Sequence, residues 1–285
     1  MSTLRYKVVD VFTDRPFTGN PLAIVFDAAD LAGEQMQAIA REFNLSETIF
    51  VLPPTTPEAT YRVRIFTPGT ELPFAGHPSV GLAVTLRRDG LVKDADVVQE
   101  CGAGLIPISI DDTHGSALVT GGTPTVGPAL DPAPLLAAVG MTGADYVGPP
   151  PRKAGCGLEF TFLSVTDEAV GRLRPTALVD QASVLHWDAE RHEAHVRVLV
   201  PDVGVAEDPA TGSAAMGLGV WLVASGLLPG EGVSRYQIRQ GSEMHRPSLL
   251  TCSVTAAGGA AVSASVSGHV VPIASGEMIV PPFVG

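Results

Sequence analysis

Alternating and continuous apolar positions predict two strands at the start of the chain. Residues 6–12 alternate charged and apolar side chains, and residues 22–26 are apolar throughout. Between them lies Phe17–Pro21, whose Gly-Asn-Pro sequence is typical of a turn. The chain is therefore expected to begin with a hairpin-like pair of strands.

Further on, helical and strand patterns alternate. Apolar side chains recur every three or four positions over residues 36–43, which predicts a helix with Asp30 as its N-cap and an end near Asn44. A second helix is expected from His77 to Arg88, where Gly90 follows as a stop signal. Strands are predicted over residues 48–52, 61–66, 97–101, 105–110 and 117–120.

The later half of the chain repeats this plan. Residues 71–91 and 207–227 match without a gap at nine of 21 positions, and a strand pattern precedes each copy, at residues 63–66 and 196–199. Each copy continues through a loop that ends in glycine into an almost wholly apolar helix. The chain is therefore expected to be internally duplicated. A helix that is apolar on all sides must be surrounded by protein.

The fold class that this duplication predicts is α+β, with two pseudo-symmetric lobes that each wrap a curved, largely antiparallel sheet around a central apolar helix. A Pro- and Gly-rich run from Gly121 to Pro134 is the best candidate for a linker. We expect residues 1–120 to form the N-terminal lobe and residues 121–274 the C-terminal lobe. The tail 275–285, with a strand from Met278 to Phe283, is expected to return to the first lobe.

Each central helix is expected to begin at a glycine, Gly76 in the first copy and Gly212 in the second. Small residues before the first turn leave backbone N–H groups free, and the helix dipole favours an anion at that end. If a pseudo-twofold axis brings the lobes face to face, the two helix starts meet, and a small carboxylate substrate would fit there. Ordinary capping, with glycine for close packing, is the alternative for either helix alone.

Composition narrows the class of protein. Hydrophobic residues make up 45% and charged residues 17%, which excludes a disordered chain, and a net charge of −12 disfavours nucleic acid and anionic lipid as partners. Three widely spaced cysteines and the lack of a hydrophobic leader favour a reducing, cytoplasmic location. Residues 211–230 carry no charge, but their helical part is too short for a bilayer, so we expect a buried helix and no membrane association.

Four ordered segments resemble the signature segments of the phenazine-biosynthesis PhzF family, which has the diaminopimelate-epimerase-like fold. These segments are Asp10–Phe12 with Gly19–Ala23, Asn44–Thr48, Glu71–Pro78 and Glu207–Ala214. The resemblance continues to Gly268–Val271 and so covers essentially the whole chain. It implies an active site between the two lobes, no cofactor, and commonly a homodimer.

The resemblance also implies roles for particular side chains. Glu47 corresponds to the glutamate that shuttles a proton as general acid and base. His77, Asp208 and Ser213 correspond to residues that bind and polarise the substrate. The reaction implied is a shift of a proton and a double bond on a small unsaturated cyclic carboxylic acid, with the isomerisation of trans-2,3-dihydro-3-hydroxyanthranilate in phenazine-type antibiotic biosynthesis as the reference case. Further substrate contacts are expected from Asn20, Ser46, Gly76, Thr211 and Gly212.

Two other classes of function stay open at this point. Epimerases and racemases of this fold, as the resemblance implies, place a cysteine just before each helix-opening glycine, whereas Ala75 and Thr211 occupy those positions. Without that thiol pair, two-base inversion of an amino acid loses its chemistry. The other alternative is a non-catalytic protein on the same fold that binds a small molecule or a partner.

Two further features of the sequence leave questions open. His245 stands where family members often carry glycine, which leaves the exact substrate undecided. A polar run before a strand fits a solvated turn better than a metal site, and no metal or organic cofactor is expected. The members of that run are His186, Asp188, His192 and His195.

Overall fold

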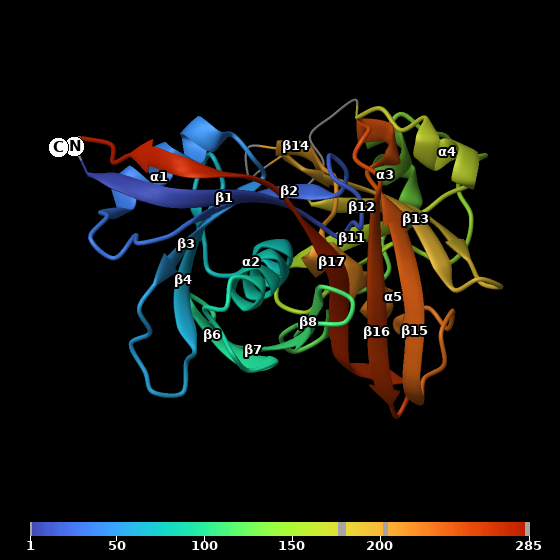
Figure 1. Ribbon diagram of the computed structural model, residues 1–285. Coiled ribbons are helices and arrows are strands. Elements are labelled where there is room, and N and C mark those ends of the chain that lie inside the picture. The colour runs from blue at the N-terminus through green and yellow to red at the C-terminus, as the bar shows by residue number, and fades with distance from the viewer. Residues whose placement is uncertain (1, 176–180, 202–204, 283–285) are drawn as a thin grey trace. The chain divides into compact units, whose positions relative to one another are not determined.

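The computed structural model describes residues 2–175, 181–201 and 205–282 (Figure 1). Contacts divide the chain into two compact units, which are described separately here. Unit 1 comprises Met1–Val119 together with Ser267–Gly285, and unit 2 comprises Thr120–Val266.

Unit 1 begins with the predicted hairpin-like pair. β1 (Thr3–Val11) pairs antiparallel with β2 (Asn20–Val25), β2 runs parallel to β3 (Glu47–Leu52), and β3 pairs antiparallel with β4 (Tyr61–Phe66). The strands predicted further along are also confirmed, each within a residue or so of its expected bounds. The remaining strands of this part of the chain are β5 (Glu71–Leu72), β6 (Asp96–Cys101), β7 (Gly104–Asp111) and β8 (Ser116–Thr120).

Helix α1 (Gly33–Phe43) is confirmed, but its predicted N-cap is wrong. The N-cap is Ala32, whose backbone N–H donates to Oε1 of Gln35 at 2.9 Å, so a side chain from the first turn satisfies the helix start and Asp30 stays outside. The helix ends as predicted, because Asn44 adopts a left-handed conformation at φ 51°, which asparagine tolerates well.

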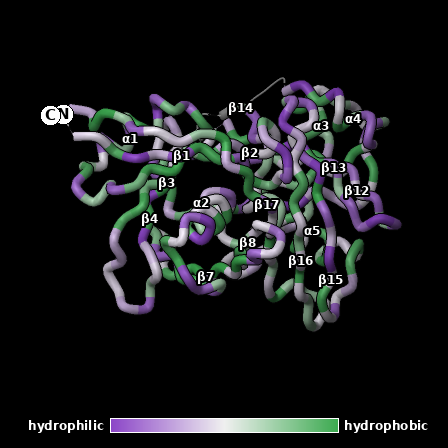
Figure 2. Tube along the Cα trace, in the orientation of Figure 1, coloured by the Kyte–Doolittle hydropathy of each residue, from purple (hydrophilic) through white to green (hydrophobic). Residues whose placement is uncertain are grey.

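The central helix of unit 1 is α2 (Gly76–Arg88), and every residue from Gly76 to Leu86 is buried. It packs against β1, β2, β3 and β7, and β3 is largely hydrophobic in Figure 2. Gly81 allows this close approach, since a Cβ there would lie 2.6 Å from a Leu22 methyl group and 2.8 Å from a Val11 methyl group. The prediction of a helix surrounded by protein is confirmed.

Unit 2 repeats this arrangement around α5 (Gly212–Ala224), which packs against β9, β10, β11 and β16 (Figure 1). Here the glycine that allows close packing is Gly219, whose added Cβ would lie 2.4 Å from the Tyr236 hydroxyl oxygen. No helix in the described part of the chain is long and apolar enough to cross a membrane. The other elements are β9 (Thr125–Val126), α3 (Pro132–Ala138), β10 (Arg152–Gly155), β11 (Glu159–Ser164), α4 (Asp167–Gly171), β12 (Ala182–Asp188), β13 (Glu193–Val200), β14 (Val205–Asp208), β15 (Gly232–Gln240), η2 (Ser242–Met244) and β16 (Ser248–Ala257).

The duplication extends to a pair of side chains in each unit. Arg64 of β4 donates two hydrogen bonds to the Glu71 carboxylate, both at 2.7 Å. Arg197 of β13 donates to the Glu207 carboxylate in the same two-point fashion, at 2.8 and 2.7 Å. Each pair ties one strand to the short strand that comes just before the central helix, β4 to β5 in unit 1 and β13 to β14 in unit 2, so the approach to both helices is fixed in the same way.

Two expectations about the chain's organisation are wrong. Gly121–Pro134 is not a linker: it contains β9, which pairs with β10, and the Gly121 N–H donates to the Ala264 carbonyl within unit 2. A Cβ on Gly121 would also lie 2.6 Å from Cβ of Cys156, so this segment is packed rather than free.

The strand expected at Met278–Phe283 is the end of a much longer strand, β17 (Ala260–Ile279), and Phe283 lies outside the described residues. The expected return of the tail to the first lobe is confirmed, because β17 pairs antiparallel with β1 from Val11↔Val270 to Thr3↔Ile279. It enters unit 1 at Ser267, however, earlier than the expected residue 275. The first and last described strands are therefore neighbours.

Candidate active site

The Gly-Asn-Pro segment places an amide inside unit 1. Gly19 has φ +68°, and a Cβ on it would lie 2.4 Å from the Val11 carbonyl oxygen, so the turn accepts only glycine. Asn20 follows as the first residue of β2 and is fully buried. The residue that composition assigned to a simple turn thus points a polar side chain into the interior.

Three predicted site residues of unit 1 lie together. Glu47 is the first residue of β3, beside β2, and its carboxylate Oε2 lies 3.4 Å from Nδ1 of His77. The amide nitrogen of Asn20 lies 3.5 Å from the same His77 nitrogen. The N-terminal ends of two parallel strands and of α2 therefore bring a carboxylate, an imidazole and an amide into contact. Ser46 stands just before Glu47 and is half-buried.

Burial sets the protonation state of His77. The side chain is 3% exposed, and desolvation lowers the pKa of its imidazole to about 3, a shift that a hydrogen bond to the Pro21 carbonyl only partly opposes. His77 is therefore neutral at pH 7, so its contact with Glu47 is not an ion pair. Among the described residues, the Nε2 atom of His77 has no hydrogen-bond partner.

Unit 2 gathers a second group of predicted residues where α5 begins. Asp208 ends β14 and is 8% exposed, and the Thr211 hydroxyl donates to its Oδ2 at 2.6 Å. Because that hydroxyl is engaged, Thr211 is the N-cap of α5 without a side-chain bond to the helix. Ser213, in the first turn, is half-buried, and its hydroxyl makes no hydrogen bond within the described parts of the chain.

Gln240 is a member of this group that the sequence reasoning missed. It is 2% exposed at the end of β15, its Nε2 donates to the Asp208 carbonyl at 2.7 Å and to the Thr211 hydroxyl at 3.1 Å, and its Oε1 accepts from the Thr211 N–H at 3.2 Å. One signal could have found it. Ser234, Tyr236 and Ile238 mark the buried phase of the alternation, and a long polar side chain in that phase needs partners.

Neither central helix has a side-chain cap at its start. Ala75 is the N-cap of α2 and Thr211 that of α5, and neither side chain accepts from a first-turn N–H. Gly76 and Gly212 begin the two helices and are buried. Uncapped N–H groups at the positive end of a helix suit a carboxylate.

His245 occupies a backbone conformation that favours glycine. It follows η2 at φ +57°, a left-handed conformation in which glycine is free of strain. Its side chain is exposed. The usual glycine at this position therefore matches the conformation of the turn.

The histidine-rich run is split among separate partners. The Nδ1 atoms of His186 and His192 lie 3.2 Å from the carbonyls of Val165 and Arg235, respectively. His195 lies between two carboxylates, 2.7 Å from Asp167 and 2.9 Å from Glu243. In residues 2–175, 181–201 and 205–282, no group of three or more His, Cys, Asp or Glu side chains is arranged to hold a metal.

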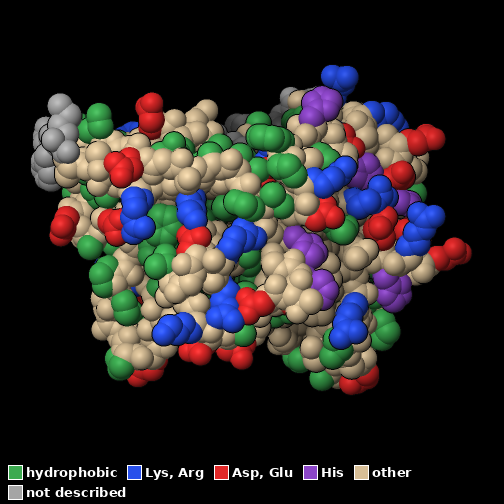
Figure 3. All heavy atoms as spheres, viewed as in Figure 1, with side chains coloured by type: hydrophobic (Ala, Val, Ile, Leu, Met, Phe, Trp, Pro, Cys, Tyr) green, Lys and Arg blue, Asp and Glu red, His purple; other side chains and the backbone are tan. Residues whose placement is uncertain are grey.

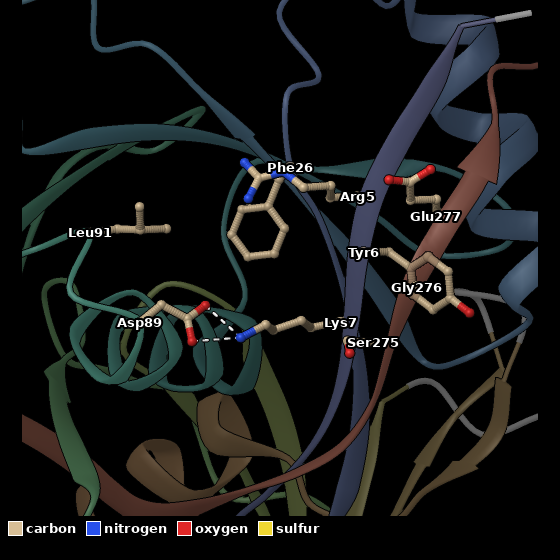
Figure 4. Close-up of a pocket in the computed structure, with 9 residues that line it drawn as sticks. All are labelled: Arg5, Tyr6, Lys7, Phe26, Asp89, Leu91, Ser275, Gly276 and Glu277. Atoms are coloured by element: carbon tan, nitrogen blue, oxygen red, sulfur yellow. Dashed lines mark hydrogen bonds and ion pairs between the residues drawn. The ribbon is translucent and has the colours of Figure 1, made fainter.

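A surface pocket of about 290 Å³ in unit 1 is a weaker candidate (Figure 4). Lys7 Nζ lies 2.5 and 2.6 Å from the two Asp89 carboxylate oxygens, and Arg5 pairs with Asp27 at 2.8 Å while its guanidinium lies over the Phe26 ring. Both cations are already neutralised, so the pocket offers little attraction to an acidic ligand. Charges of both signs are also intermixed across the face shown in Figure 3.

Comparison with known proteins agrees with this chemistry. A family model described as phenazine biosynthesis-like protein, PhzC-PhzF, matches residues 9–276. An uncharacterised isomerase of Mesorhizobium japonicum is 36% identical, over 98% of this chain and all of its own length. The trans-2,3-dihydro-3-hydroxyanthranilate isomerase of Pseudomonas aeruginosa is 37% identical, over 96% of this chain and 98% of its own.

Among solved structures, a PhzF-family phenazine biosynthesis protein of Bacillus anthracis superposes with a TM-score of 0.87 at 26% identity, over 98% of this chain and all of its own. The chain therefore belongs to the phenazine biosynthesis-like PhzC-PhzF family, and it is an isomerase with the α+β fold of that family.

Proposed function

We propose that the protein moves a proton, and with it a double bond, on a small unsaturated cyclic carboxylic acid of the dihydro-hydroxyanthranilate type. The observation that carries the proposal is the carboxylate of Glu47 beside the buried, neutral imidazole of His77. The name and substrate of the relative from Pseudomonas aeruginosa support the choice of substrate class.

In the proposed reaction, the Glu47 carboxylate takes a proton from one ring carbon. The electron pair of that C–H bond shifts along the allylic system, and the same carboxyl group returns the proton to another carbon on the same face. A neutral His77 can donate or accept one hydrogen bond without adding a charge beside Glu47. These steps move only a proton and an electron pair within the substrate, so they need no cofactor.

Asp208 and Ser213 are proposed to bind the substrate, a role that the family resemblance implies. The half-buried hydroxyl of Ser213 and the uncapped N–H groups of α5 are donors that suit a substrate carboxylate. That these groups serve the same substrate as Glu47 stays a prediction. The homodimer and the cytoplasmic location also stay predictions.

An epimerase that uses two thiols is the less favoured candidate. Cys156 and Cys252 are buried, and burial raises the pKa of the Cys156 thiol to about 11 and that of Cys252 further still. Thiols in such surroundings are poor bases and nucleophiles at pH 7. Cys101, the third, is in a strand that follows α2, not in front of either central helix.

The test is Glu47→Gln, which keeps the shape of the side chain and removes the base. With trans-2,3-dihydro-3-hydroxyanthranilate in deuterated water, we expect kcat to fall by about 10²-fold or more while KM stays nearly constant. Glu42→Gln, on the exposed side of α1, is the matched control and should keep the wild-type rate. A Glu47→Gln variant that isomerises this substrate at close to the wild-type rate would refute the proposal.

A further inference from the structure

Gln240 connects three polar groups where α5 begins, all within unit 2. Its amide donates to the Asp208 carbonyl and to the Thr211 hydroxyl, and it accepts from the Thr211 backbone N–H. These hydrogen bonds determine the orientation of the Gln240 amide, that is, which of its two terminal atoms is the oxygen and which the nitrogen. In the opposite orientation, the amide oxygen would face the Asp208 carbonyl oxygen, and the NH₂ group would face the Thr211 N–H.

The fixed amide also fixes the direction of the next hydrogen bond. A hydroxyl has one proton, and the Thr211 hydroxyl accepts from Gln240, so its own proton is directed to Oδ2 of Asp208 at 2.6 Å. That carboxylate oxygen is thus an acceptor. A carboxylate has about four lone-pair sites, so Asp208 can accept from other donors as well as from Thr211.

The turn after β15 holds Gln240 against the loop of Asp208. Gly241 has φ +78°, and a Cβ on it would lie 2.5 Å from the carbonyl oxygens of both Pro209 and Arg246. No other residue fits there without moving one of these backbones. The backbone next to Gln240 is therefore packed against the loop that follows Asp208.

We propose that Gln240 is a positioning residue that commits the Thr211 hydroxyl proton to Asp208, so that Asp208 meets the substrate as a hydrogen-bond acceptor and takes an amino or hydroxyl donor of the substrate. The part concerning the substrate rests on the proposed function. The part concerning Gln240 and Thr211 does not, because it follows from the hydrogen-bond directions alone.

Ligand binding tests the proposal without turnover. The probes are anthranilate and salicylate, which carry an amino or hydroxyl donor beside the carboxylate, and benzoate, which carries neither. By calorimetry, we expect the wild type to bind at least one of the two donor-bearing probes about 10-fold or more tightly than benzoate, since a hydrogen bond to a charged acceptor contributes that much. A wild type that binds all three equally would overturn the assignment of a donor.

Two variants of Gln240 test the positioning role. Gln240→Glu keeps the size of the side chain, but its carboxylate has no hydrogen-bond donor and would itself accept the Thr211 hydroxyl proton. Gln240→Leu removes all three hydrogen bonds of the Gln240 amide. Both should lower the ratio of donor-probe to benzoate affinity to about 1–3, and Gln240→Leu combined with Thr211→Val should lower it no further. Gln237→Leu, on the exposed face of β15, should keep the wild-type ratio.

If Gln240 had a structural role alone, its loss would weaken the binding of all three probes equally and leave the ratio of donor-probe to benzoate affinity unchanged. If either variant of Gln240 folds and keeps the wild-type ratio, the positioning role is wrong. This outcome is distinct from a failure of the proposed isomerisation, which would appear in the turnover of Glu47→Gln and not in the binding of these probes.

Discussion

The buried imidazole of His77 makes the stability of the protein depend on pH in a calculable way. In the folded protein its pKa is about 3, whereas a histidine in an unfolded chain titrates near 6.5. A lowered folded-state pKa means that the unfolded chain takes up the proton first. The stabilisation is therefore fully present above about pH 6.5 and is lost progressively as the pH falls toward 3.

The size of the effect follows from the two pKa values. Between pH 7 and pH 5, the unfolded chain gains about three-quarters of a proton at this position while folded His77 stays neutral, which lowers the free energy of unfolding by about 2 kcal/mol. Other groups also titrate in this interval, so the comparison is with His77→Gln, which keeps a polar side chain and removes the titration.

The measurement is urea unfolding followed by far-UV circular dichroism at pH 7 and pH 5. We expect the wild type to lose about 2 kcal/mol more than His77→Gln between the two pH values. The matched control is His269→Gln, at an exposed position of β17 in the same unit. Equal losses in the wild type and His77→Gln would mean that the imidazole is solvated or already charged in the folded protein, and the reasoning would fail.

Two further predictions concern stability. Glu207→Gln should lower the free energy of unfolding by about 3 kcal/mol, because it leaves a largely buried Arg197 without its carboxylate. Glu71→Gln, at the corresponding but more exposed pair, should lower it by about 1 kcal/mol or less. Equal losses for the two variants in denaturant titrations would contradict the role of burial. Gly219→Ala should lower the free energy of unfolding by about 1–3 kcal/mol, because the new Cβ would collide with the buried Tyr236 side chain, whose hydroxyl donates to the Ala215 carbonyl at 2.7 Å. Gly143→Ala, where a Cβ has open space, should leave stability unchanged, and an unchanged melting temperature for Gly219→Ala would show that α5 can move away from β15.

Much of the fold was predictable because it rests on local patterns. The alternation in β1, β4 and β7 and the apolar character of α2 and α5 are visible residue by residue, and the duplication reinforced them. The full length of β17 was not predicted, because residues 260–279 are rich in alanine, serine and glycine, whose small side chains give only a weak alternation of apolar and polar positions. The N-cap was predicted wrongly because Asp30, a good capping residue, lies two positions before the true N-cap, Ala32, whose N–H is satisfied by Gln35.

The residues of the candidate site were harder to predict from the spacing of residues along the sequence. Uncapped helix starts are visible in the sequence, but Glu47, His77 and Asp208 were named through the family resemblance, since a lone glutamate or aspartate beside a turn is ordinarily solvated. Gln240 had no signal of that kind, because its partners lie about 30 residues away in the chain and become partners only when β15 packs beside the loop before α5.

The long last strand has a consequence for the order in which the protein assembles during synthesis. Unit 2 is continuous from Thr120 to Val266, so none of its internal contacts has to wait for the residues after Val266. β1 emerges first, yet its β17 neighbour is made last, and joining the ends of an unstructured loop of that length costs about 5 kcal/mol of chain entropy. Prior folding of unit 2 shortens that loop. A nascent chain stopped before Ser267 would carry every residue of the candidate site and still expose one edge of β1, the kind of unpaired strand that chaperones and proteases recognise.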